Sequence, residues 1–61
     1  MKSELDQRID SLERGQSIVL SSVNEITCSV ERSGDGKILR FVRTFADGSF
    51  EVFRKVDFDR W

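Results

Sequence analysis

Few side chains in this sequence are suited to catalysis. Histidine, the usual general base, is absent, and Cys28 is the only cysteine. No base is evident beside the serines of the turns and polar strand faces, which are Ser17, Ser21, Ser22, Ser29, Ser33 and Ser49. We therefore predict no catalytic residue and expect a protein that is not an enzyme.

Motifs for a metal or a cofactor are also missing from the pattern. Without histidine, a Cys/His zinc site cannot be assembled within the chain. The stretch SGDGK at 33–37 is rich in glycine, but it lacks phosphate-loop spacing and leads into a strand, which indicates a β-turn. Asp57 and Asp59 flank Phe58, and solvated charge is the simpler interpretation of this pair than a weak cation site. We expect no metal and no cofactor.

The size of the chain favours self-association. With 61 residues it forms one domain over 1–61, and a domain this small is marginally stable alone. A single cysteine excludes an internal disulfide, and Cys28 is expected to be a buried thiol on an inward strand position. A partner chain is the remaining means of stabilisation, so we expect a homodimer.

One helix is predicted at 3–14. Ser3 is suited to the N-cap, Asp6 completes a capping box, and Gly15 is placed for the left-handed residue after the helix. Its apolar stripe is Leu5, Ile9 and Leu12. This stripe packs either on the sheet of the same chain, which we favour, or along the matching stripe of a second copy, since the spacing also fits a heptad.

The rest of the chain has the two-residue period of strands. Residues 16–21 form either a short strand, which we favour, or a continuation of the helix, and strands are predicted at 25–32, 37–46 and 49–57. The turns between the last three strands are short. The expected fold is therefore α+β, with one N-terminal helix packed on a three- or four-stranded antiparallel β-meander.

The two turns predict a register. A two-residue type I′ turn at Asp47-Gly48 pairs Phe41 with Arg54, whose guanidinium would lie over the Phe41 ring. A turn centred on Gly34-Asp35 pairs Val30 with Leu39. Both place one apolar set on the face under the helix: Ile26, Cys28, Val30, Leu39, Phe41, Phe45, Phe50, Val52 and Val56.

A second register uses a type I turn with a bulge at Gly48. It pairs Phe41 with Phe53 and Arg43 with Glu51. We rank it second because it puts Val30 and Phe50 on opposite faces of the sheet.

The first register leaves an apolar strip on the outer face. There Val42 opposes Phe53 and Arg40 opposes Lys55. The predicted interface consists of Ile38, Val42, Phe53 and Trp61, because clustered exposed apolar residues mark binding surfaces and tryptophan is frequent at their energetic centres. Trp61 is alternatively a residue that closes the edge of the core.

Nucleic-acid binding is the alternative function. Residues 32–55 hold six basic and three acidic side chains, whereas residues 1–31 hold three basic and six acidic ones. Basic residues around an exposed phenylalanine suit single strands, and the candidates are Arg32, Lys37, Arg40, Phe53 and Lys55. The sequence pI of about 5.3 argues against this function.

We therefore expect a small protein–protein interaction module, a homodimer that acts as an adaptor or an inhibitor on a protein partner that the sequence does not identify. The longest apolar run, at 18–20, is too short for a membrane span, and the polar start is unlike a signal peptide. The lone thiol fits the reducing cytoplasm.

Overall fold

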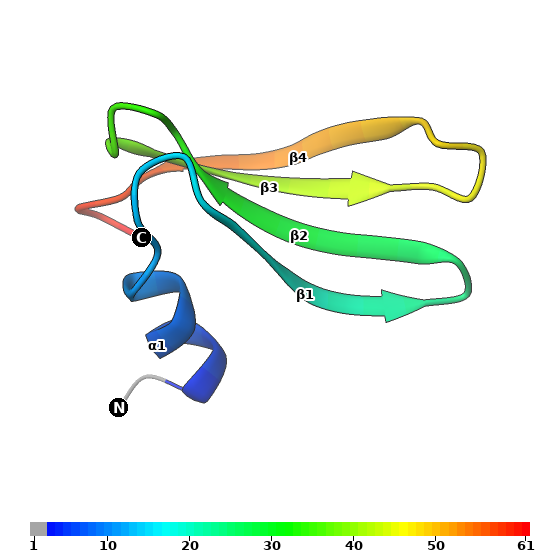
Figure 1. Cartoon of the computed structure of the whole chain (residues 1–61), viewed down its shortest axis with the longest axis horizontal. Helices are drawn as coiled ribbons and strands as arrows, with labels where there is room; N and C mark the ends of the chain where they lie inside the picture. The colour runs from blue at the N-terminus through cyan, green and yellow to red at the C-terminus, as the bar shows by residue number, and fades with distance from the viewer. Residues whose placement is uncertain (1–2) are drawn as a thin grey trace.

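The computed structural model describes residues 3–61, which form one helix and one sheet. The elements are α1 (Glu4–Asp10), β1 (Ser17–Val23), β2 (Ile26–Arg32), β3 (Ile38–Thr44) and β4 (Phe50–Asp57). All neighbouring strands are antiparallel, in the order β1-β2-β3-β4. The expected α+β fold, a helix and an antiparallel meander, is confirmed. Figure 1 shows α1 at one end of the sheet, while the two hairpins at the other end project away from it.

The helix is shorter than the predicted range 3–14. Ser3 is the N-cap, and its Oγ accepts a hydrogen bond of 3.2 Å from the Asp6 N–H, whereas Ser11 already forms the C-cap. Gly15 has the positive φ expected of it (+74°), but it lies in the loop before β1, where its N–H donates to the carbonyl of Arg32 at 2.9 Å. The last predicted turn of helix is thus replaced by a loop held against β2.

The core lies between α1, the loop after it and one end of the sheet. Its buried residues are Ile9, Leu12, Val30, Leu39 and Phe41, with Ile18, Leu20, Val56, Phe58 and Trp61 packed around them. The helix therefore packs on its own sheet, as favoured from the sequence. Leu5, predicted to belong to the same stripe, is instead 36% exposed, because the short helix reaches only the end of the sheet.

The first hairpin contains a two-residue turn and a bulge. Asn24 and Glu25 both have positive φ, of 53° and 66°, as a type I′ turn requires. Between Val19 and Ser21 the pairing with β2 shifts by one residue, so Leu20 is an extra residue in the edge strand. β1 extends through Val23, beyond the predicted end at residue 21.

The second hairpin is closed by a longer turn than predicted. The Ser33 N–H donates to the Ile38 carbonyl at 2.8 Å, and Gly36 between them has φ +77°. Val30 therefore pairs with Phe41, and the predicted pairing of Val30 with Leu39 is wrong by two residues. Because side chains alternate with a period of two, this shift leaves every residue on its predicted face.

The third hairpin has the turn that we ranked second. Gly48 has φ +88° and its N–H donates to the Phe45 carbonyl at 3.0 Å, while the Phe45 N–H donates to the Ser49 carbonyl at 2.8 Å. This is a type I turn followed by a bulge at Gly48, so the predicted type I′ turn is wrong. Asp47 supports it, because its carboxylate accepts a hydrogen bond of 2.9 Å from the Ser49 N–H.

A bulge at Phe53 then changes the register of β4. On the turn side of the bulge, Arg43 pairs with Glu51, as in the second register. Beyond it, Phe41 pairs with Arg54, as in the first register. The strand uses both registers, one in each half.

The turn at Gly48 inverts the predicted orientations of the residues before this bulge, and the bulge restores the predicted orientations after it. Phe50 and Val52, expected in the core, are 70% and 46% exposed on the other face. Phe53, expected to face outward beside Val42, instead lies on the helix side, where its ring centre is 6.3 Å from that of Phe41. The Arg43 guanidinium lies 4.7 Å from the centre of the Phe53 ring and binds Glu51 at 2.7 Å.

Candidate functional site

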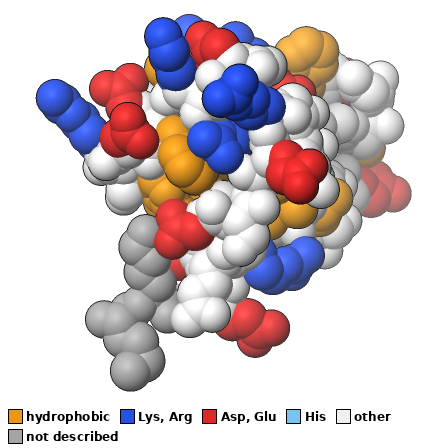
Figure 2. Space-filling view, turned by 60° about the vertical axis from the view of Figure 1, so that its left-hand side comes forward, with side chains coloured by type: hydrophobic (Ala, Val, Ile, Leu, Met, Phe, Trp, Pro, Cys, Tyr) orange, Lys and Arg blue, Asp and Glu red, His pale blue; other side chains and the backbone are white. Residues whose placement is uncertain are grey.

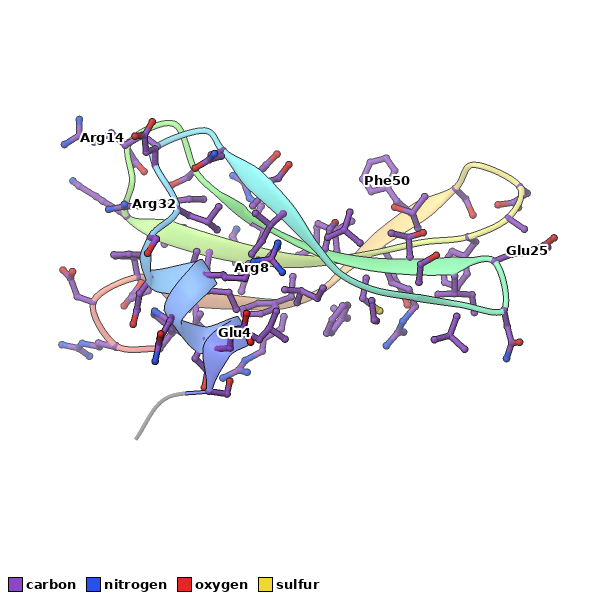
Figure 3. All side chains as sticks on the ribbon, turned by 60° about the horizontal axis from the view of Figure 1, so that its bottom comes forward. Glu4, Arg8, Arg14, Glu25, Arg32 and Phe50 are labelled. Atoms are coloured by element: carbon purple, nitrogen blue, oxygen red, sulfur yellow. The ribbon has the colours of Figure 1, made fainter. Side chains whose placement is uncertain are left out.

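The face of the sheet away from α1 carries no helix, and we call it the open face. Figure 3 shows Phe50 pointing to this side, away from α1. Residues that pair directly across neighbouring strands lie on the same face of the sheet. The pairing therefore shows which residues make up the open face and arranges them in rows that run across the strands.

The central row of the open face is Val19, Ser29, Val42 and Val52, one residue from each strand. The next row toward the third hairpin is Ser22, Thr27, Thr44 and Phe50. We name Val19, Val42, Phe50 and Val52 the open-face patch. Val19 is 57% exposed, Phe50 is 70% exposed and Val52 is 46% exposed, and only small polar residues separate them. Clustered exposed apolar side chains of this kind are typical of binding sites.

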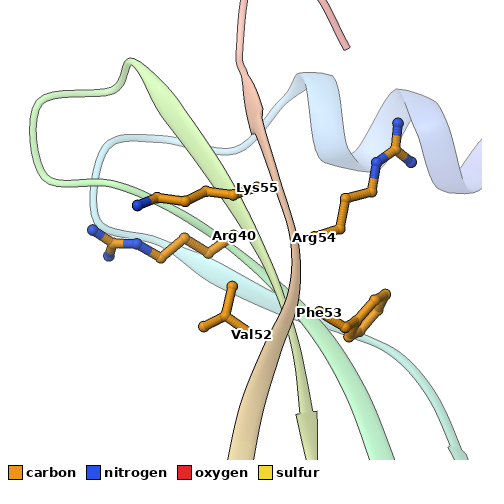
Figure 4. A pocket seen from close by; sticks show the side chains of 5 residues that line it. All are labelled: Arg40, Val52, Phe53, Arg54 and Lys55. Atoms are coloured by element: carbon orange, nitrogen blue, oxygen red, sulfur yellow. The ribbon is translucent and has the colours of Figure 1, made fainter.

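A charged row borders the patch on the side of the core. It is formed by Ser17, Glu31, Arg40 and Lys55, again one residue from each strand. Arg40 Nη1 lies 3.2 Å from Glu31 Oε1, and both side chains are close to half exposed. In Figure 4, Arg40, Lys55 and Val52 project on one side of β4, whereas Phe53 and Arg54 project on the other. Phe53 therefore does not lie on the open face.

The predicted interface residues do not form one surface. Ile38 and Val42 lie half-buried on the open face, and Ile38 is paired with Asp57 at the end of the sheet. Phe53 lies on the helix side, and Trp61 packs against the core. Of the four predicted interface residues, Ile38 and Val42 share the open face, whereas Phe53 and Trp61 lie elsewhere.

Sequence reasoning missed Val19, Phe50 and Val52 as members of this surface. The second register contained the signal for two of them, because a bulge at Gly48 puts Phe50 and Val52 on the face of Val42. The outward orientation of Val19 could have been predicted from the alternation in Ile18-Val19-Leu20. Ile18 and Leu20 pack against the core, and Val19 is exposed.

The candidate nucleic-acid residues are also dispersed. The Arg32 guanidinium is engaged within the fold, because it donates to the carbonyls of Leu12 at 2.7 Å and Gly36 at 2.9 Å. Arg40 is paired with Glu31, and Lys37 lies in the second hairpin turn. Arg40 and Lys55 are direct partners, as predicted, but Phe53 is on the other face. The residues predicted for nucleic-acid binding therefore do not form one surface around Phe53.

The end of the molecule that carries α1 has a different character. Figure 2 shows basic and acidic side chains interspersed there, with hydrophobic atoms reaching the surface in small separate areas. Within residues 3–61, no group of three or more histidine, cysteine, aspartate or glutamate side chains is arranged to hold a metal ion. The open-face patch is therefore the candidate binding surface of this chain.

Comparison with known proteins adds no family. The chain matches no protein-family model, no curated protein and no solved structure. Among the residues that the structure describes, no helix is long and apolar enough to cross a membrane. The function of this chain is therefore inferred from its surface chemistry.

Proposed function

We propose that this protein is a non-enzymatic interaction module that binds another protein surface through the open-face patch, as an adaptor or an inhibitor. One observation carries the proposal: four apolar side chains from three strands lie together on a sheet face that α1 does not cover. Removing such side chains from water stabilises a complex by about 25 cal/mol for each Å² of apolar surface that is buried.

The shape of the chain supports this proposal. Its radius of gyration is 11.7 Å, and its smallest extent is 16 Å. A compact domain of this length has a radius of gyration of roughly 10.5 Å. The accessible surface is 4509 Å², compared with roughly 4,100 Å² for a typical folded monomer of this mass. The protein is flat and exposes more surface than its size requires, as expected when one sheet face is completed by a partner.

Two valines of β1 provide a matched test. Val19 is in the patch and 57% exposed, whereas Val23 is 64% exposed and paired with Ile26 on the opposite face. Photo-crosslinking in an extract of the native host, with the crosslinker at position 42, would compare the wild type with Val19→Asp and Val23→Asp. We expect Val19→Asp to abolish the crosslinked protein adduct and Val23→Asp to retain it.

Two results would contradict the proposal. One is an adduct that survives Val19→Asp as well as Val23→Asp, because the patch would then not be the binding surface. The other is salt-sensitive binding of a single-stranded oligonucleotide that is lost in a variant with Arg40→Glu and Lys55→Glu, because this would favour the nucleic-acid alternative.

A further inference from the structure

We infer that the protein on the open-face patch is a second copy of this chain, packed face to face about a two-fold axis that runs parallel to the strands between β2 and β3. The inference rests on the proposed function and specifies its partner. A two-fold interface requires a self-complementary surface, so each row of the open face must fit the row of the second copy that it meets.

Such an axis reverses the order of the strands and keeps their direction. β1 of one copy then lies over β4 of the other, and β2 lies over β3. Each transverse row of the open face meets the same row of the second copy. Aligned packing of this kind, with a modest crossing angle from the twist of the sheets, is a common way for two sheets to form a shared core.

The side-chain sizes match in this arrangement. In the central row, Val19 meets Val52 of the second copy, and the small Ser29 meets Val42. In the next row, the small Ser22 meets Phe50 of the second copy, which is the most exposed of the large apolar side chains in the described part of the chain. Small residues opposite large ones allow the two faces to interdigitate.

The charges match as well. Glu31 lies over Arg40 of the second copy, and because of the symmetry this pair occurs twice. The charged residues at this end of the open face are Glu31, Arg40, Lys55 and Asp57, and their formal charges sum to zero. A two-fold axis at right angles to the strands would instead place Arg40 and Lys55 over the row of Thr44 and Phe50, which offers no acidic partner from the second copy to either cation.

The area of the surface indicates the affinity. A sheet of four strands with about seven residues each covers roughly 19 Å by 23 Å, or about 440 Å² in projection. Two such faces together give roughly 900 Å², which is below the range of stable specific complexes and within that of weak, transient ones. We therefore expect a dimer with a micromolar Kd.

Sedimentation equilibrium over a range from about 1 to 500 µM tests the partner. The wild type is expected to change from the 7.1 kDa chain mass to twice that value as the concentration rises. Val19→Asp should remain at the monomer mass throughout, while Val23→Asp should behave as the wild type does. Circular dichroism of each variant would verify that it is folded.

A charge exchange tests the geometry. In Glu31→Arg combined with Arg40→Glu, the ion pair within the chain and the pair across the interface are both retained, so this chain should dimerise with itself. In a mixed dimer with the wild type, Glu31 would face a glutamate and Arg40 an arginine. The exchange leaves the mass of the chain unchanged, so the variant is labelled with 15N; native mass spectrometry of an equimolar mixture with the unlabelled wild type should then show mixed dimers clearly below the statistical half.

The outcomes are distinguishable. A wild type that stays monomeric at every concentration overturns self-pairing but leaves the proposed function standing if the host adduct still depends on Val19. Dimers that respond equally to Val19→Asp and Val23→Asp overturn face-to-face packing and point to pairing through the β1 edge. Mixed dimers at the statistical fraction overturn the inferred axis.

Discussion

The guanidinium group of Arg32 lies 3.7 Å from the centre of the Phe58 ring. The same group donates hydrogen bonds to the carbonyls of Leu12 and Gly36. Arg32 thus joins the loop after α1, the turn between β2 and β3, and the segment after β4. These three segments surround the end of the sheet where the core lies, so one side chain holds together the parts that a short helix cannot cover.

Replacing Arg32 with lysine should therefore destabilise the fold. Lysine cannot donate to two divergent carbonyls while stacking flat on a ring, and we expect a loss of about 2–3 kcal/mol in the free energy of unfolding. Urea unfolding would measure it. The control is Arg40→Lys, which affects only a half-exposed ion pair and should change stability by less than about 0.5 kcal/mol. Equal effects of the two variants would contradict this role of Arg32.

Gly36 should be intolerant of a side chain. Its φ is +77°, and an added Cβ would lie 3.0 Å from Arg14 Cγ and 3.2 Å from Arg32 Nη2. Gly36→Ala should lower the free energy of unfolding by about 1–2 kcal/mol, since the left-handed conformation is unfavourable for alanine.

The matched control for this position is Gly34→Ala in the same turn. A Cβ at Gly34 meets nothing within 4 Å and its φ is not in the left-handed region. This variant should be neutral or up to about 1 kcal/mol more stable, because alanine restricts the unfolded chain. Thermal unfolding of both variants would check the pair, and a neutral Gly36→Ala would contradict the described turn.

The register of β4 after the turn at Gly48 leads to different predictions for Phe50 and Phe53. Phe53→Ala removes the contact with the Phe41 ring and with the Arg43 guanidinium, and should cost about 1–2 kcal/mol of stability. Phe50→Ala removes a 70% exposed ring and should cost less than about 0.5 kcal/mol in dilute, monomeric protein. Urea unfolding at low concentration would compare them. The reverse order of stability would indicate the register of a type I′ turn, in which Phe50 faces the core and Phe53 faces outward.

Acid should weaken two of the turns. The hydroxyl of Ser33 and the backbone N–H of Lys37 bind the Asp35 carboxylate and hold its pKa below the ordinary value of 3.8. The hydroxyl and N–H of Ser49 lower the pKa of Asp47 in the same way. A pKa lowered in the folded state means that the unfolded state takes up protons first as the pH falls.

The stabilisation from Asp35 and Asp47 should therefore be complete above about pH 4 and disappear as the pH falls through their lowered folded-state pKa values. The midpoint of urea unfolding, measured between about pH 5 and pH 2, should decrease in the wild type. A variant with Asp35→Asn and Asp47→Asn should be less stable than the wild type at pH 5 and should show a shallower decrease. An unchanged slope in this variant would mean that other groups control acid unfolding.

Much of the fold was predictable because local signals agree with one another. Ser3 marks the start of the helix, and alternation in the last three strands places Val30, Leu39 and Phe41 on the buried face. The partnership of Phe41 with Arg54 was also correct, and the Arg54 guanidinium lies 5.3 Å from the centre of the Phe41 ring. These features depend on the two-residue alternation of apolar side chains and on capping residues, both of which can be identified from the sequence.

The composition of the candidate site was not predictable in the same way. The turn signal Asp47-Gly48 fits both a type I′ turn and a type I turn with a bulge, and the two differ by one residue in register. The choice depends on contacts between distant residues: Phe53 packs on Phe41, Arg43 pairs with Glu51, and Val56 still reaches the core. Only a bulge satisfies all three.

The sequence alone thus determined the helix start, the antiparallel meander and the inner residues of the central strands. The tertiary structure decided which side of the sheet Phe50, Val52 and Phe53 occupy. The physical reason is that side chains in a strand alternate with a period of two, so a single extra residue exchanges the two faces. No local preference specifies where that residue is inserted, because its position is set by packing against the other strands and the core.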